Sequence, residues 1–381
     1  MNVRERLGRV ASIDGLAIAL ALAAAVIYFS FASPFFMTGE NIRNLLIQSL
    51  FIILLAAGMT FTLVTGGFDL SVGSVTGLSA AMTLMSLMNG APLAAGILAG
   101  VATGVVAGAI NGFFIAVLKI NGFIVTLASL SIGAGMLQVI TSQVQLTGVD
   151  SQAFAALTKG SFLGVPTGLW ITLVIVGVLE WVLLATPFGR GLFALGTNRE
   201  AAFLAGTNVR RLTFSVYLIS GTVAGAAGVL LASHLNSVQP GLGQGYELSA
   251  IAAAVLGGIA LSGGRGSVWR SVVGALFLAT LSQGLQLIGV DPMWFNIVTG
   301  ASIVIAVAFD RGIQRLVAVQ LASAAAKGAP ARHTAPDPSD GSVSVAEDAG
   351  QKLPALPVPG PTAQGAGEAE SGSSLSVARN M

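Results

Sequence analysis

The sequence predicts an all-α polytopic membrane protein, and three observations carry this prediction. Of its 381 residues, 54% are hydrophobic and only 9% are charged. The mean hydropathy is +0.84, whereas soluble domains usually contain about a quarter charged residues. Apolar runs of about 20 residues, the length needed to cross a bilayer, recur along the chain. No soluble fold of this length hides so much apolar surface.

These runs predict about ten transmembrane helices. The run near 248–261 is short and bounded by glycine, so a broken or re-entrant helix is expected there. The basic N-terminus and its apolar run to Phe31 look like a signal peptide, but no convincing cleavage site follows and an uncleaved first helix is expected. The predicted spans lie near 13–33, 45–64, 72–88, 92–118, 123–141, 168–185, 212–233, 248–261, 269–289 and 294–309.

The basic residues predict that both termini are cytoplasmic. In that orientation twelve of the fourteen Lys and Arg residues before position 322 lie inside, and only Arg43 and Lys159 lie outside. The opposite orientation would break the positive-inside rule. The sequence therefore predicts a transmembrane domain over 1–321. The remaining 322–381 are rich in Ala, Gly, Pro and Ser, and this composition predicts a disordered cytoplasmic tail.

The segment 66–74 (Gly-Gly-Phe-Asp-Leu-Ser-Val-Gly-Ser) stands between two apolar runs and organises the rest of the chain. A charge at the bilayer centre costs about 2.5–3.5 kcal/mol on insertion scales, so Asp69 belongs at a membrane face or beside a wet cavity enclosed by protein. One interpretation is a solute pathway made of exposed backbone. The other is a Gly-Gly turn with Asp69 and Ser71 capping the next helix.

An internal echo supports the first interpretation. Residues 257–262 repeat the pattern of 66–71, and each copy is followed by a Gly/Ser stretch that opens a helix. Paired broken helices in duplicated halves indicate a transport pathway at their interface, although the spacing of the two copies differs by about one span. The candidate pathway residues are Gly66, Gly67, Asp69, Ser71, Gly257 and Gly258.

The inner loop 186–211 is predicted to carry a short surface helix over 197–206. It has an Asn/Thr N-cap, an acidic first turn and a glycine at the C-cap position. Phe203 and Leu204 are then available to a partner, or the helix rests on the lipid interface. The outer loop, about 142–167, is predicted to be an ordinary polar loop.

Two further acidic residues have simple interpretations. Glu180 lies in an apolar run and is expected to snorkel to the inner interface. Glu247, at the outer end of a span, is expected to be solvated, with contact to a binding protein as the alternative.

Several classes of function are excluded or disfavoured. Cysteine is absent and the two histidines are far apart, so neither a metal nor a cofactor is expected. No phosphate-binding loop of the form G-x-x-x-x-G-K-[ST] occurs, and no catalytic cluster is visible, so ATP hydrolysis or another enzymatic activity is not expected. The modest net charge of +2 does not indicate nucleic-acid binding.

Four motifs in order resemble those of the permease subunits of bacterial ABC importers for ribose, xylose, galactose and related sugars. The resemblance runs from about Asn44 to Asp310. The segment 58–74 is similar to the most specific family signature, and 123–127 to the second. Gly196 to Gly206 resembles the loop that docks the ATPase, and 245–267 the fourth motif. Ser249 stands where the family usually carries Asp, which leaves the exact sugar open.

The resemblance implies the pore subunit of a monosaccharide importer in the bacterial inner membrane. It implies as partners ABC ATPase subunits, a second permease subunit in a homodimer or heterodimer, a periplasmic or lipid-anchored solute-binding protein, and membrane lipids. It also implies the residues that couple the pore to the ATPase, which are Gly196, Asn198, Glu200, Ala201, Ala202 and Gly206.

Two alternatives are kept. One is a permease of the same class for an autoinducer-2-like or other small polar solute. The other is an ion-coupled secondary carrier, which requires buried carboxylates near the midplane; in the sequence Glu180 is the one weak candidate.

Overall fold

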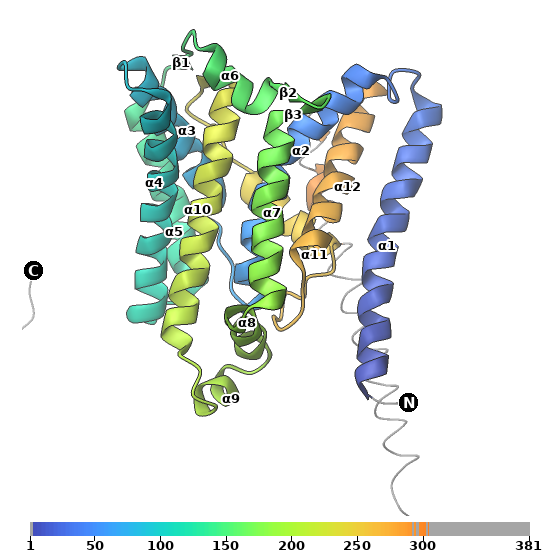
Figure 1. Ribbon diagram of the computed structural model, residues 1–381, viewed down its shortest axis with the longest axis vertical. Coiled ribbons are helices and arrows are strands. Elements are labelled where there is room, and N and C mark those ends of the chain that lie inside the picture. Colours follow the sequence, from blue (N-terminus) through green and yellow to red (C-terminus); the bar gives the residue numbers. More distant parts are fainter. Residues whose placement is uncertain (1–2, 292, 295–296, 302–303, 305–381) are drawn as a thin grey trace, which may run out of the picture. The chain divides into compact units, whose positions relative to one another are not determined.

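The computed structural model describes residues 3–291, 293–294, 297–301 and 304. Most of these residues are helical (Figure 1). The elements are α1 (Val3–Ala32), α2 (Gly39–Val64), α3 (Val72–Met88), α4 (Leu93–Gly112), the π-helix η1 (Phe113–Val117), α5 (Gly122–Ile140), β1 (Leu146–Thr147), α6 (Gln152–Lys159), β2 (Ser161–Phe162), β3 (Val165–Pro166), α7 (Thr167–Ala185), α8 (Pro187–Thr197), α9 (Arg199–Leu204), α10 (Val209–Leu235), β4 (Ser237–Val238), α11 (Tyr246–Leu256) and α12 (Val268–Leu287).

Six helices are long and apolar enough to cross a membrane: α2, α4 continued by η1, α5, α7, α10 and α12. They match six of the ten predicted spans. Three more predicted spans correspond to the shorter apolar helices 16–32, 72–88 and 246–256. The tenth, 294–309, falls mostly outside the described residues, as does the predicted tail 322–381. The total of about ten spans stays a prediction.

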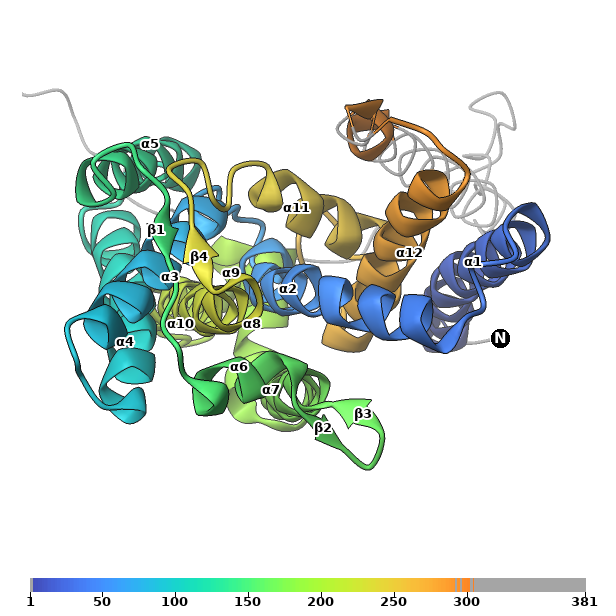
Figure 2. The same cartoon turned by 90° about the horizontal axis from the view of Figure 1, so that it is seen from above.

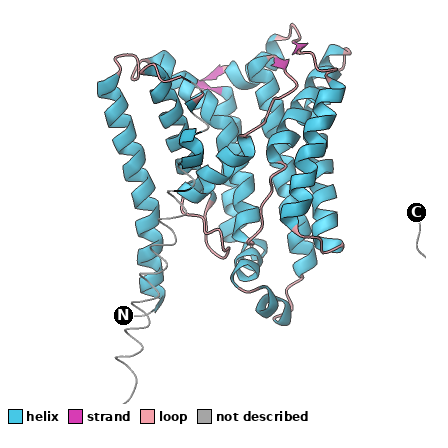
Figure 3. Ribbon diagram, turned by 180° about the vertical axis from the view of Figure 1, so that it is seen from behind, coloured by secondary structure: helices cyan, strands magenta, loops and turns pink. Residues whose placement is uncertain are grey.

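The outer loop is more structured than its polar sequence indicates. Two antiparallel pairs of very short strands form there, with Leu146 of β1 opposite Val238 of β4, and β2 beside β3. They gather at one end of the helices (Figure 3). Helix α6 lies across the end of α10, where Thr158 Oγ1 donates a hydrogen bond of 2.9 Å to Leu230 O. The ordinary-loop prediction is therefore wrong, because this loop covers one end of α10.

Helix α2 is the centre of the core. In its most apolar window, 89% of the residues are buried, and it packs against α10, α12, α11 and α7. Seen from above, it lies between α10 and α12 (Figure 2). A helix that is apolar on all sides is buried by its neighbours, so α2 is a scaffold for the elements around it.

The closest helix pair is joined by glycines. Gly100, Gly104 and Gly108 recur every four residues on α4 and face Gly221 and Gly225 on α10. A Cβ built on Gly104 would lie 2.7 Å from the Cα of Gly225, which is too short for any real contact. Small residues at such seams let helix backbones approach in lipid, and this seam uses part of the chain's large glycine content.

Two of the helices that match predicted spans are short. Helix α3 has 17 residues and α11 has 11. At a rise of about 1.5 Å per residue, α11 covers about half of a 30 Å hydrocarbon core. The expectation of a broken helix near 248–261 is consistent with this length. Both short helices follow an irregular link, 65–71 before α3 and 239–245 before α11.

Candidate functional site

The link 65–71 leaves α2 through a turn that only glycine adopts easily. Gly66 has φ +77°, and its N–H donates a hydrogen bond of 2.8 Å to Leu63 O. Gly67 N donates to Thr62 O at 2.9 Å. A Cβ on Gly67 would lie 2.9 Å from the hydroxyl of Tyr217 on α10. The Gly-Gly pair therefore closes α2 and lets the chain pass tightly against α10.

Asp69 lies at the end of this link and is only 1% exposed. Its Oδ1 accepts hydrogen bonds from Ser71 N at 3.1 Å and from Ser71 Oγ at 2.6 Å. Its Oδ2 accepts a bond of 2.7 Å from Ser220 Oγ on α10. A buried carboxylate with both oxygens bonded avoids much of the cost of burial. The carboxylate bonds the chain two residues ahead, next to the positive N-terminus of α3. The interpretation that Asp69 and Ser71 cap α3 is wrong in its detail, because Ser71 is the N-cap residue but its side chain makes no capping hydrogen bond.

The hydrogen bonds continue into two further helices. Asn111 Nδ2 on α4 donates to Ser71 Oγ at 2.9 Å, and Ser129 Oγ on α5 donates to Asn111 Oδ1. The network of Asp69, Ser71, Asn111, Ser129 and Ser220 therefore ties the link to α4, α5 and α10. Ser220 is about 16 Å along α10 from Val209 by helical rise, so the network is near the middle of that helix. Its members beyond Asp69 and Ser71 have no local sequence signal, because each partner comes from a distant segment.

Glu247 lies against the start of α3 and is only partly exposed. A Cβ built on Gly73 would collide with Glu247 Oε2 and with Gly243 O. Glu247 Oε1 accepts from Gly245 N at 3.1 Å. Its Oε2 is buried without a hydrogen-bond partner in the described part of the chain. The prediction of a solvated Glu247 is wrong for this oxygen, because Gly243 lets the link 239–245 pack against the backbone of Gly73 in the first turn of α3.

The two short helices therefore begin side by side. The first turn of α11 lies against the first turn of α3 at Gly73, and the preceding link lies against Gly77 through Leu242 O. Helix α11 ends against the start of α12, where a Cβ on Gly257 would collide with Arg270 O. Two broken helices meeting at their positive ends match the arrangement by which secondary transporters hold polar groups at mid-membrane depth.

Three glycine-rich segments meet at the opposite end of the link. Gly264 N donates a hydrogen bond of 2.8 Å to Val64 O, and a Cβ on Gly196 would collide with the same carbonyl. Gly66 packs on Ser262, since its Cβ position lies 3.5 Å from Ser262 O. This glycine junction (residues 64–66, 196–197 and 262–264) joins both copies of the internal echo to the end of α8.

The predicted residues Gly257 and Gly258 take a packing position. Gly257 is the C-cap of α11, and Gly258 has φ +81°. Neither lines the cavity at the start of α10 or the one at its end. Their assignment to a pathway stays a prediction.

The short surface helix in the inner loop is confirmed. Asn198 is its N-cap and accepts a hydrogen bond of 2.9 Å from Ala201 N. Helix α9 then runs only to Leu204, and Gly206 turns the chain at φ +81°. Ala202 is buried, whereas Phe203 and Leu204 are 65% and 78% exposed. The preceding helix, α8, was not predicted.

Glu180 does not snorkel. Its Oε1 accepts from Ser267 Oγ and its Oε2 from Val268 N, both at 2.7 Å. These groups begin α12, so a carboxylate on α7 caps the N-terminus of another helix. The snorkelling prediction is wrong because the partner lies 87 residues away in sequence.

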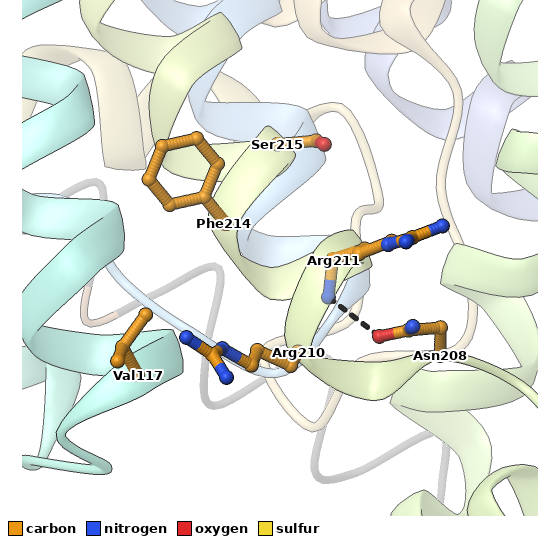
Figure 4. A pocket seen from close by; sticks show the side chains of 6 residues that line it. All are labelled: Val117, Asn208, Arg210, Arg211, Phe214 and Ser215. Carbon is orange, nitrogen blue, oxygen red and sulfur yellow. Dashed lines mark hydrogen bonds between the residues drawn. The ribbon is translucent and has the colours of Figure 1, made fainter.

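A basic cavity of ≈ 630 Å³ lies where α10 begins and the π-helix η1 ends. Arg210 extends across it towards Val117, and Arg211 extends to the other side (Figure 4). Asn208 Oδ1 accepts from Arg211 N at 3.0 Å and so caps α10. Helix α10 begins at the end of the helices that carries α9 (Figure 1), so the cavity belongs to that end. By contrast, Arg43 and Lys159 meet at the α6 end, where Arg43 Nη2 donates to Lys159 O at 2.6 Å.

Known proteins similar to this chain are transport permeases. Residues 41–307 match the family described as branched-chain amino acid transport system / permease component. The ribose import permease protein of Bacillus subtilis is 42% identical over 294 residues, which are 77% of this chain and 91% of the relative. The L-arabinose transport system permease protein of Escherichia coli is 39% identical over 282 residues, 74% and 86% of the two chains.

The D-allose transport system permease protein of Escherichia coli is 34% identical over 296 residues, 77% of this chain and 90% of the relative. No solved structure matches the chain. Both the extent of the family match and the coverage of the relatives exceed two thirds of the chain, and the matched region holds the broken helices, their glycine junction and α9. The chain therefore belongs to this family of membrane permease components of transport systems.

Proposed function

We propose that this chain is the permease subunit of an ABC importer in the bacterial inner membrane, forming the pathway for a ribose- or xylose-like monosaccharide. In this proposal it crosses the membrane about ten times with both termini in the cytoplasm, and residues 322–381 are a cytoplasmic tail beyond the transmembrane domain 1–321. The relatives named for ribose, L-arabinose and D-allose support a monosaccharide as the solute.

The glycine junction is the observation that carries the proposal. One end of α8 contacts Val64, beside the pathway candidates Gly66 and Gly67, and also Gly264, which follows the echo segment 257–262. A displacement of α8 and α9 therefore acts directly on the link 65–71 and on residues 262–264. A transporter driven by an external motor requires such contacts, because a partner shifts a two-state equilibrium only through contacts that differ between the states.

The proposed partners follow from the surfaces at the two ends. ABC ATPase subunits would bind the exposed Phe203 and Leu204 on α9. A periplasmic or lipid-anchored solute-binding protein would bind the α6 end. A second permease subunit, identical or not, would complete the pathway, and the long apolar helices contact membrane lipids.

A matched pair of substitutions tests the coupling helix. Leu204 is 78% exposed on α9 and Leu163 is 80% exposed at the α6 end. Leu204→Glu is expected to abolish co-purification of the ATPase with the permease, while Leu163→Glu leaves it at the wild-type level. Both variants should insert in the membrane in equal amounts. Recovery of the ATPase with Leu204→Glu at wild-type yield would refute the assignment of α9.

Gly206→Pro tests the same helix through its backbone. The φ of +81° at Gly206 cannot be adopted by proline, and Gly206 N donates to Phe203 O at 2.9 Å. The variant is expected to insert normally and to lose sugar-stimulated ATP hydrolysis. Unchanged stimulation in the reconstituted complex would contradict the proposal.

An ion-coupled carrier is the second candidate, and one observation favours it. The chain holds a buried carboxylate, Asp69, at the start of α3 and a partly exposed one, Glu247, with one buried oxygen at the start of α11, and such a carrier requires buried carboxylates. Vesicles discriminate the two. Uptake that stops on ATP depletion with the ion gradient intact supports the importer, and uptake that persists without ATP supports the carrier.

The solute class is tested through the binding protein. The proposal expects that the cognate binding protein binds a monosaccharide. If it binds only an autoinducer-2-like compound or another small polar solute, the permease assignment stands and the sugar assignment fails.

A further inference from the structure

A second cavity, of ≈ 320 Å³, lies among four helices. Membership of the permease family does not by itself assign a ligand to it. Its walls come from α2, α10, α11 and α12. Tyr246, the first residue of α11, is part of the wall. The cavity is therefore adjacent to the start of the short helix α11. It lies towards the α6 end of the helices, because His234 and Leu235, at the end of α10, line it.

The cavity has the size and shape of an entry site. Small-molecule sites are concave and usually measure about 300–1,000 Å³, so this one suits a ligand at the small end of the range. Gln48 and Leu235 are exposed at its edge, whereas Phe51 is buried. A ligand would pass Gln48 and come to rest against Phe51 and Tyr246.

The polar groups of the wall are unused. His234 Nδ1 is buried and has no hydrogen-bond partner among the described residues. The side chains of Gln48 and Ser282 make no hydrogen bond with the part of the chain that the structure describes. A buried atom such as His234 Nδ1 is costly unless a ligand or water pairs with it, and the more exposed Gln48 and Ser282 can bond the same ligand. Together they offer both donors and acceptors, as a polyhydroxylated ligand requires.

Aromatic rings supply the flat surfaces. The rings of Phe51 and His234 are 5.7 Å apart between centroids, at 40° to one another, and Tyr246 adds a third ring and a hydroxyl. The C–H faces of a pyranose or furanose pack on such rings while its hydroxyls bond the polar groups around them. Among the residues that the structure describes, no Asp, Glu, Lys or Arg lines the cavity, so this part of its wall favours a neutral ligand over an ionised one.

We infer that this cavity is a binding site for a neutral monosaccharide, which holds the sugar between its release from the binding protein and its passage across the break at α11. The inference rests on the proposed function, because it assigns the site to the same solute. It adds contact residues on α2, α10 and α12 that are separate from both the echo segments and the coupling helix.

Direct binding of D-ribose to the purified full-length permease in lipid nanodiscs tests the site, with saturation-transfer NMR as the readout. D-Ribose is the solute named for the Bacillus subtilis relative. Gln48→Leu removes an exposed edge group, and His234→Phe keeps a ring but removes Nδ1. Losing one hydrogen bond to the sugar should raise its Kd roughly tenfold in each variant.

Gln286→Leu is the matched control, because Gln286 is an exposed glutamine on α12 that does not line the cavity. Its Kd should equal that of the wild type. Equal Kd values for all four proteins, or no saturation transfer to ribose from the wild type, would overturn the inference. Gln48 is exposed, so its variant is expected to fold even where His234→Phe does not.

Transport by the complex with ATPase and binding protein separates this inference from the proposed function. If the wild-type complex imports sugar and Gln48→Leu imports it with unchanged KM and rate, the site is wrong and the importer stands. If the wild-type complex hydrolyses ATP but moves no monosaccharide, the proposed function itself fails. A raised KM for sugar in Gln48→Leu, with the ATPase still assembled on the permease, supports both the sugar site and the importer function.

Discussion

Ser220 Oγ on α10 donates a hydrogen bond of 2.7 Å to Oδ2 of Asp69, joining two residues that are 151 positions apart. This bond holds the link 65–71 against the middle of α10. It also gives the second carboxylate oxygen a hydrogen-bond donor, since the other oxygen accepts hydrogen bonds from Ser71. The position of the first broken helix therefore depends on one hydroxyl of a neighbouring helix.

Ser220→Ala is expected to destabilise the protein by about 1.5–3 kcal/mol, because a hydrogen bond to a charged group is lost in a buried place. SDS titration of the purified protein in mixed micelles measures this change. Thr222→Val is the control on the same helix, since the Thr222 hydroxyl donates only to Leu218 O one turn back. Equal stability of Ser220→Ala and the wild type would show that Asp69 does not need this partner.

Gly104→Ala is expected to cost about 1–3 kcal/mol by overpacking the seam between α4 and α10. The added Cβ would collide with Gly221 O. Gly135→Ala on α5 meets nothing within 4 Å, and there alanine should be neutral or stabilise by about 0.5–1 kcal/mol through helix propensity. The same titration compares the two variants. The seam is contradicted if both change stability in the same direction by the same amount.

Removing the Glu180 cap should loosen the start of α12. Glu180→Ala and Ser267→Ala each break the bond between these side chains, so the double variant is expected to be less destabilised than the sum of the single ones. The coupling should lie within about 0.5–3 kcal/mol, the range for residues in contact. Full additivity would mean that the carboxylate does not act on Ser267.

The absence of cysteine from the whole sequence makes the orientation directly testable. A membrane-impermeant maleimide on intact cells with an open outer membrane should label Leu163→Cys and spare Leu204→Cys. Both should react once the inner membrane is opened, because both side chains are largely exposed. Labelling of Leu204→Cys in intact cells would reverse the proposed orientation.

The features that could be predicted from the sequence are those that depend on residues close together in the chain. Apolar run length gave six of the helices able to span, including α2 and α10. The cap at Asn198 and the turn at Gly206 placed α9 within a few residues. The echo between 66–71 and 257–262 also marked two segments that meet at the glycine junction.

The features that sequence missed depend on contacts between distant segments. Nothing near Glu180 indicates that its partner begins another helix 87 residues later. Glu247 looks solvated in sequence because its surroundings depend on Gly73, on a different helix. The network around Asp69 likewise draws its hydroxyls and amide from α4, α5 and α10. A single sequence carries no signal for such pairings. The segment 66–74 could therefore be predicted to matter, but the partners of Asp69 on the other helices could not.

The glycine junction also limits how this protein can evolve. At Gly196 and Gly263 the neighbouring backbones leave no space for even a methyl group, so a side chain at either position requires a backbone to move. The wall of the smaller cavity consists of side chains, which can be exchanged one at a time without moving a backbone. New solute preferences in descendants of this gene should therefore arise at positions such as Gln48 and Ser282, while the moving parts stay unaltered.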